Sequence, residues 1–252
     1  MRVTVRAPAD EEFHPMTVTI DTVVSPHDRR AAVSTAFRHT MTALRHLDPE
    51  APRVYAVADM AEQSKRRWWS FATGLESGRF EALLRRSSLD HPDPRRAVDQ
   101  VAAALVHAVV GRSAAAFVGC GRVWDPGPEN LWIHLDSDVG IDWAGVRDTA
   151  LRSVSGSGAT AGTVVMPCDE ALAAWTAHRA ARSLEVAAAG LSALGPLDAT
   201  QMSRIVGESV LGASARVPLL GGVSRDGGWR RGQMLLDAFV DAGWRVRLRR
   251  LA

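Results

Sequence analysis

Acidic and amide side chains gather around a turn-rich stretch near the middle of the chain. Asp125 is followed five positions later by Asn130, and Asp142 comes after a further segment that is typical of a hairpin. Carboxylate and amide oxygens are ligands that Mg²⁺ prefers, and a carboxylate can also act as a general base. Tight turns favour the same Asp, Asn, Pro and Gly residues for conformational reasons. The stretch therefore indicates either a polar site or an ordinary turn.

The spacing of these three residues resembles the catalytic loop of kinase-like phosphotransferases. That resemblance implies Asp125 as the catalytic base, and Asn130 and Asp142 as ligands of magnesium, with ATP as the phosphate donor. The segment 141–143 (Ile-Asp-Trp) is also similar to the metal-binding turn of aminoglycoside-type kinases. Val123, however, stands where that loop has a histidine, and the first hundred residues contain no glycine-rich phosphate loop. A kinase-like transferase or an adenylating enzyme is therefore one alternative.

Two segments with aromatic residues supply further candidates for binding a small polar ligand. In the segment 131–135, apolar residues alternate with Trp132 and His134, so the two sets face opposite sides of a strand. Arg67 belongs to a basic and aromatic run that includes Trp68 and Trp69 and offers charge and stacking to an anion. A helix with core tryptophans and solvated arginines explains the same run more simply. Trp132, His134 and Arg67 join Asn130 as predicted ligand-binding residues.

Hydrophobic periodicity and turn signals predict an α+β fold. We expect helices at 26–46, 58–71, 79–86, 95–110, 169–194, 199–215 and 233–242, and strands at 16–24, 54–57, 131–135, 139–143, 163–166 and 245–251. The proline-rich break at 90–94 predicts two parts. Residues 1–90 would form a small sheet-plus-helix part, and residues 91–252 a larger, mainly helical part around a central β-hairpin.

From about residue 90 onward, the chain resembles a known family. The helix at 95–110, the bend and the strand from Leu131 are similar to the middle of the ferric-siderophore reductase (FhuF-like) family and to the C-terminal region of aerobactin-type siderophore synthetases. Segments 205–215 and 232–242 resemble later helices of the reductases. That family holds a [2Fe–2S] cluster on C-terminal cysteines, whereas the end of this chain, 244–251, has none. We therefore expect no such cluster and no electron transfer by that mechanism.

The resemblance implies a cluster-less relative that acts in iron–siderophore or specialised-metabolite metabolism. Its ligand would be a small molecule, siderophore-like or another metabolite, bound near the bend at 121–143. The kinase-like or adenylating enzyme, with ATP and Mg²⁺, is one alternative. A non-catalytic partner of a biosynthetic enzyme is another.

Composition limits the remaining classes of function. The 252 residues carry a net charge of only +2, and no basic stripe with interleaved aromatic residues occurs, so we expect no nucleic-acid partner. No segment has the length and apolarity expected of a membrane span or a signal core, so we expect no membrane partner. Cys120 and Cys168 are the only cysteines, too few for a disulfide framework. These features predict a cytoplasmic protein with reduced thiols.

Overall fold

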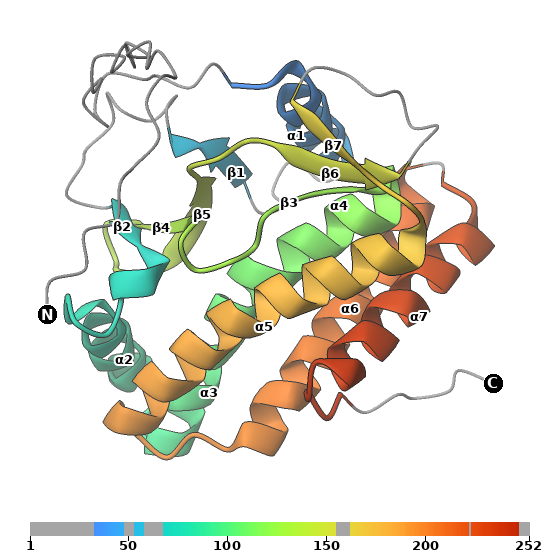
Figure 1. Ribbon diagram of the computed structural model, residues 1–252. Helices are drawn as coiled ribbons and strands as arrows, with labels where there is room; N and C mark the ends of the chain where they lie inside the picture. The colour runs from blue at the N-terminus through green and yellow to red at the C-terminus, as the bar shows by residue number, and fades with distance from the viewer. Residues whose placement is uncertain (1–32, 48–52, 58–67, 155–161, 222, 247–252) are drawn as a thin grey trace, which may run out of the picture. The chain divides into compact units, whose positions relative to one another are not determined.

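The computed structural model describes residues 33–47, 53–57, 68–154, 162–221 and 223–246. All of them belong to one compact unit, Ala31–Ala252. This unit combines helices with two small sheets, which confirms the predicted α+β class (Figure 1). The predicted division at residue 90 falls in the loop between two helices, and both sides of that loop lie in this same unit.

The described helices agree with the hydrophobic periodicity in most places. They are α1 (Thr35–Leu47), α2 (Arg79–Asp90), α3 (Pro94–Val106), α4 (Arg112–Cys120), α5 (Asp169–Leu194), α6 (Ala199–Gly221) and α7 (Arg225–Asp241), with a 3₁₀ turn η3 (Phe71–Thr73) and a π turn η4 (His107–Gly111). Helix α5 has the predicted bounds. Helix α6 is longer than predicted because it continues through Pro218, and α7 begins eight residues before the predicted 233.

Helix α1 begins later than its sequence suggested. Val33 and Ser34 are not helical, and the Ser34 hydroxyl accepts a hydrogen bond from the backbone N–H of Phe37 at 3.1 Å, as an N-cap does. The expected start at 26 lies outside the described residues, as does the expected strand at 16–24. At the other end of the chain, the described residues 244–246 form no strand, and 247–251 lie outside the description.

The first sheet contains four strands in the order β1-β5-β4-β2. They are β1 (Arg53–Ala56), β5 (Ile141–Val146), β4 (Leu131–Leu135) and β2 (Trp68–Ser70). The predicted hairpin is confirmed as the antiparallel pair β4–β5, and β1 runs parallel to β5. The predicted helix at 58–71 is wrong where the structure describes it. Trp68 and Trp69 form β2, because pairing with β4 places Trp69 in the core and Trp68 on the opposite face.

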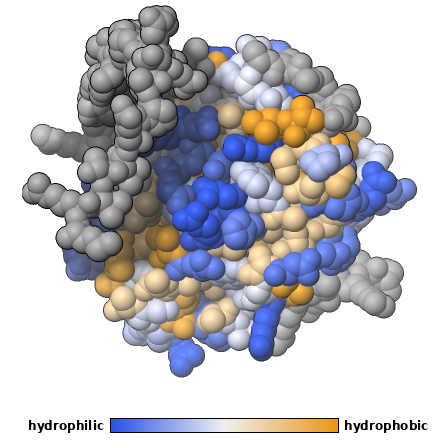
Figure 2. Space-filling view, viewed as in Figure 1, coloured by the Kyte–Doolittle hydropathy of each residue, from blue (hydrophilic) through white to orange (hydrophobic). Residues whose placement is uncertain are grey.

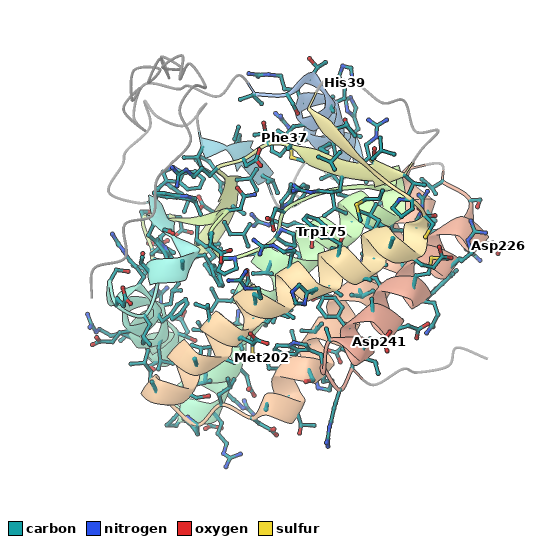
Figure 3. The ribbon with its side chains drawn as sticks, in the orientation of Figure 1. Phe37, His39, Trp175, Met202, Asp226 and Asp241 are labelled. Carbon is teal, nitrogen blue, oxygen red and sulfur yellow. The ribbon has the colours of Figure 1, made fainter. Side chains whose placement is uncertain are left out.

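The second sheet was only partly predicted. Its strands are β3 (Arg122–Trp124), β6 (Leu151–Val154) and β7 (Thr163–Met166), in the order β3-β6-β7. Only β7 was expected. Val164 and Val165 of this edge strand are exposed, and Figure 2 shows an apolar patch where Figure 1 places β7. The cationic group of Arg152 on β6 lies 4.5 Å from the ring centre of Trp175 on α5 and joins this sheet to the helices. Figure 3 labels Trp175.

A continuous helical segment, Pro94–Cys120, forms the centre of the unit. It joins α3, η4 and α4 and packs against α1, α5, α6 and α7. Asp93 precedes it as the N-cap, and its carboxylate accepts a hydrogen bond from the Arg95 N–H at 3.0 Å. Contrary to the expectation from the sequence, its length and composition would suffice to cross a membrane, but 78% of its most apolar window is buried inside the protein. That burial is typical of a core helix.

Two glycines in neighbouring helices should respond in opposite ways to alanine. A Cβ on Gly190 of α5 would lie 2.2 Å from Cδ2 of the fully buried Phe80, whereas a Cβ on Gly212 of α6 would meet no atom within 4 Å. Overpacking costs about 1–3 kcal/mol, and replacing a helical glycine gains about 1 kcal/mol. We predict that Gly190→Ala lowers the free energy of unfolding in urea and that Gly212→Ala raises it. A stabilised Gly190→Ala protein would contradict the close packing of α5 on α2.

Candidate functional site

The side chain of Asn130 ties two loops together. Its amide nitrogen donates to the backbone oxygens of Asp125 at 2.9 Å and Asp148 at 3.2 Å, and its amide oxygen accepts from the Asp148 N–H at 2.6 Å. The residue is only 6% exposed. Both N–H donors and the oxygen are therefore occupied by backbone groups, and the amide holds the β3–β4 loop against the segment that follows β5.

Helix α5 fixes the same loop from the other side. The Asp125 carboxylate accepts from the Gly127 N–H and from Nε of Arg179, both at 2.8 Å. The bond to Asp125 and the charges of Asp125 and Glu129 raise the pKa of Arg179 above its ordinary value, although burial opposes them. A Cβ on Gly127 would lie 2.1 Å from this guanidinium, so a side chain there would push Arg179 away from Asp125. Ser183 adds a hydrogen bond to the Pro126 oxygen at 2.6 Å.

A second polar pair lies on the hairpin. Nδ1 of His134 is 2.7 Å from Oδ1 of Asp142, which also accepts from the Trp143 N–H at 2.7 Å. The ladder shifts register at His134, and this bulge lets Asp142 turn back toward the histidine. The His134 ring stacks on Trp143, with ring centres 4.7 Å apart, and lies 5.0 Å from the ring centre of Trp68.

The predicted site residues thus form two separate groups. Asp125 and Asn130 are joined in the β3–β4 loop, and His134 and Asp142 in the hairpin, but no hydrogen bond or ion pair between the described residues connects the two groups. Trp132 lies partly buried on the same sheet face as His134. Arg67 lies outside the described residues.

Metal coordination at the bend gains no support from this arrangement. A kinase-like centre needs an Asn130 oxygen and an Asp142 carboxylate on one ion, whereas here each is held by different partners. Within the described ranges, no group of three or more His, Cys, Asp or Glu side chains is placed to hold a metal ion. The hydrogen bonds of Asp125 and Asn130 instead give these side chains a structural role, in which they hold the loop in place.

The backbone of Asp142 connects the first sheet to the central helical segment. Its backbone oxygen accepts a hydrogen bond at 3.1 Å from Nη2 of Arg112, the first residue of α4. The Arg112 side chain is almost fully buried. Burial lowers its pKa to about 10, and the negative charge of Asp142 acts in the opposite direction. Buried charged groups with a shifted pKa are common at functional sites, so the surface beside Arg112 is a candidate for one.

An open groove of about 490 Å³ lies beside Arg112. Its walls come from α1, from the continuous α3–α4 segment and from α6. Apolar side chains form most of the surface, notably Leu44, Leu47, Ile205, Val217 and Leu220, and the polar residues are His107, Arg112, Glu208, Ser209 and Arg216. Ligand sites typically combine an apolar hollow of this size with a few polar groups.

The π turn η4 shapes one wall of the groove. Such turns are rare and are often found at functional sites. Gly111 is needed here because a Cβ on it would lie 2.6 Å from Nδ1 of His107. The His107 ring is exposed toward the groove, yet enough protein atoms surround it for desolvation to lower its pKa, and the charge of Arg112 lowers it further. The sequence signal for this π turn is a histidine placed four residues before a glycine inside an apolar helix.

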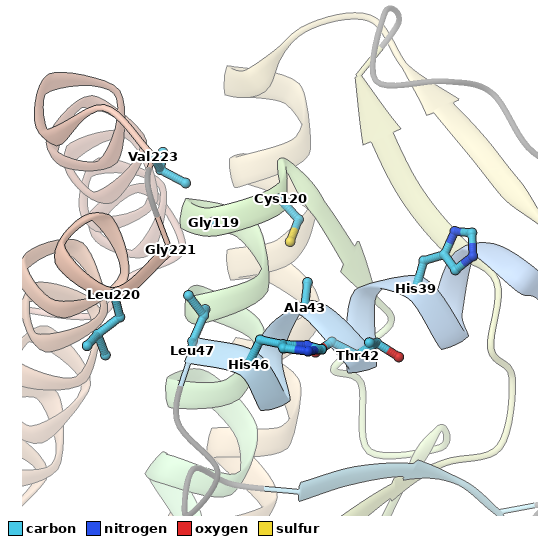
Figure 4. Close-up of a pocket in the computed structure, with 10 residues that line it drawn as sticks. All are labelled: His39, Thr42, Ala43, His46, Leu47, Gly119, Cys120, Leu220, Gly221 and Val223. Atoms are coloured by element: carbon cyan, nitrogen blue, oxygen red, sulfur yellow. The ribbon is translucent and has the colours of Figure 1, made fainter.

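A second hollow of about 470 Å³ adjoins the groove and shares Leu47 and Leu220 with it. Figure 4 shows Cys120 at the end of α4 with its sulfur directed into this hollow, opposite α1. Burial raises the pKa of the Cys120 thiol, so the thiol form is favoured. Neither hollow is lined by Asp125, Asn130, His134 or Asp142.

No protein-family model, curated protein or solved structure significantly matches this chain.

Replacing Asn130 by aspartate tests whether this residue has a structural role or is a metal ligand. Asn130→Asp keeps the shape but places a carboxylate against the Asp125 and Asp148 oxygens and removes both N–H donors. We predict a loss of at least about 2 kcal/mol in the free energy of unfolding. Glu129→Gln, which removes charge from a half-exposed group, should cost about 1 kcal/mol or less. If Asn130→Asp is as stable as the wild type in urea titrations, a ligand role for this position regains support.

Acid should weaken the fold partly through His107. Its pKa in the folded protein lies below the ordinary 6.5, so the unfolded chain binds more protons as the pH falls through that value. The stability contribution of neutral His107 is therefore complete above about pH 7.5 and declines below it. We predict that His107→Gln loses less stability than the wild type between pH 7.5 and 5.5 in thermal unfolding. Parallel curves for the two proteins would contradict a lowered pKa.

Proposed function

We propose that this chain binds a small organic molecule in the groove between α1, the α3–α4 segment and α6. The observation that carries the proposal is an open hollow of about 490 Å³ whose apolar walls hold a few charged and polar groups. The π turn and the buried Arg112 lie in its wall, and both features are common at functional sites.

The groove is a better candidate than the bend because its surface is available. The amide group of Asn130 and Oδ1 of Asp125 already have protein partners at 2.6–3.2 Å. Gly212, in contrast, lines the groove, and a Cβ built on it would meet no atom within 4 Å. A ligand could occupy this space without displacing any protein group.

The biological setting that we propose is iron–siderophore or specialised-metabolite metabolism. This part of the proposal rests on the resemblance of the helix at 95–110, the bend and the following strand to the ferric-siderophore reductase family. A groove that binds a small molecule is compatible with such a role and requires no iron–sulfur cluster.

Ligand binding can be tested with a groove-filling variant. Gly212→Phe places a ring in the open space, whereas Gly212→Ala adds one methyl group and serves as the matched control. The neutral fluorophore N-phenyl-1-naphthylamine should bind the wild type and Gly212→Ala, and Gly212→Phe should lose at least about 90% of the fluorescence, because the ring fills the volume needed by the probe. Equal fluorescence from all three proteins would show that the groove is not the binding site.

A thermal-shift panel tests the proposed metabolic setting. Ferric hydroxamate siderophore, haem and Mg-ATP would each be added to the wild type and to Gly212→Phe. A ligand at a hundred times its Kd stabilises the native state by about 2.7 kcal/mol, which corresponds to about 5–10 °C for a protein of this size. A rise in the Tm of the wild type alone with the ferric siderophore would support iron–siderophore metabolism, whereas no shift with it would favour another specialised metabolite. A shift with Mg-ATP alone would instead support a transferase.

A further inference from the structure

We infer that the ligand of the groove is an elongated organic acid, with a carboxylate facing Arg216 and an apolar chain lying along Leu47 and Leu220. The inference rests on the proposed function, because it takes the groove as the ligand site. It is carried by the balance of charge in the groove, by the exposure of its apolar walls and by its continuity with the second hollow.

The charges that line the groove are predominantly positive. Arg216 on α6 is exposed and makes no ion pair with any described residue, and Arg112 on α4 is also cationic. Among the described residues of the lining, the one carboxylate, Glu208, forms an ion pair with Arg204 of the same helix. An incoming carboxylate therefore meets one unengaged guanidinium, and the local excess of positive charge disfavours an organic cation.

The apolar walls need a cover that a purely polar ligand would not supply. Leu220 is 57% exposed although it borders both hollows, and Leu47 beside it is only partly buried. Burying apolar surface contributes about 25 cal/mol per Å², or a factor of about four in affinity for each methylene group. An alkyl or aromatic chain over these leucines would thus gain affinity steadily with length.

The two hollows together favour a long ligand over a compact one. They measure about 490 and 470 Å³ and meet at Leu47 and Leu220. Arg216 lines only the groove, whereas Cys120 and His39, labelled in Figure 4, line only the second hollow. A chain that starts at Arg216 and crosses the shared leucines would enter the second hollow.

The test compares three probes that share a ten-carbon chain. Decanoate, decan-1-ol and decylamine would each displace N-phenyl-1-naphthylamine from the wild type. We expect decanoate to compete at a concentration about fivefold lower than the alcohol or the amine, as an ion pair to an exposed arginine allows. Hexanoate and octanoate should be weaker than decanoate, by about fourfold for each methylene removed.

Removing the guanidinium should abolish the preference for the acid. In Arg216→Gln, decanoate should compete no better than decan-1-ol, with each competition scaled to the affinity of that variant for the neutral fluorophore. Arg85→Gln removes an exposed arginine from α2, far along the chain and outside the lining of either hollow, and should keep the full preference.

The outcomes separate the two proposals. If the three probes compete equally in the wild type, or if Arg216→Gln keeps the preference for decanoate, the organic acid is wrong while the groove remains a ligand site. If the affinity does not rise with chain length, the elongated ligand is wrong. If the fluorophore binds Gly212→Phe as well as it binds the wild type, the groove itself is not the site.

Discussion

Burial of one long apolar helix is the constraint on which the rest of this structure depends. The segment Pro94–Cys120 exposes few polar groups, so it must be covered along its length, and α1, α5, α6 and α7 supply that cover. Close approach of these helices requires small residues along the segment, and it has several alanines and glycines. Where the π turn interrupts the regular spacing at His107–Gly111, the helices do not close completely, and the groove lies there. The core and the candidate site are thus products of the same helix.

Residues of the bend show how chemistry and architecture can use the same side chains. Asp125 and Asn130 have the types and spacing of a metal-dependent loop, yet their atoms satisfy backbone groups that a tight, buried turn would otherwise leave without partners. Arg179 and Ser183 on α5 complete this arrangement. An unpaired buried polar group costs more than a surface bond gains, so such a loop needs these side chains whether or not it has a ligand.

The sequence predicted the elements whose signals are local. Helix α5 has the predicted bounds because its apolar periodicity is long and uninterrupted, and the hairpin β4–β5 follows from alternation and turn residues. Strand β2 was mistaken for helix because three residues with two tryptophans carry no period of their own, and only pairing with β4 decides their state. His134 and Asp142 were expected in one region and are bonded to each other. The groove could not be predicted, because α1, α4 and α6 are distant in the sequence and come together only through tertiary packing.

Two glycines keep the groove open, and each does so at the expense of helix stability. Gly111 leaves room for the His107 ring beside the π turn, and Gly212 leaves empty space in the facing wall. A glycine inside a helix costs about 1 kcal/mol relative to alanine, and at Gly212 no packing contact offsets this cost, because a Cβ there would touch nothing. Gly190 and Gly127, in contrast, are required by the packing of neighbouring side chains. A helical glycine without a steric reason, placed in the wall of an apolar hollow with cationic groups, leaves the space that the small-molecule ligand we propose would occupy.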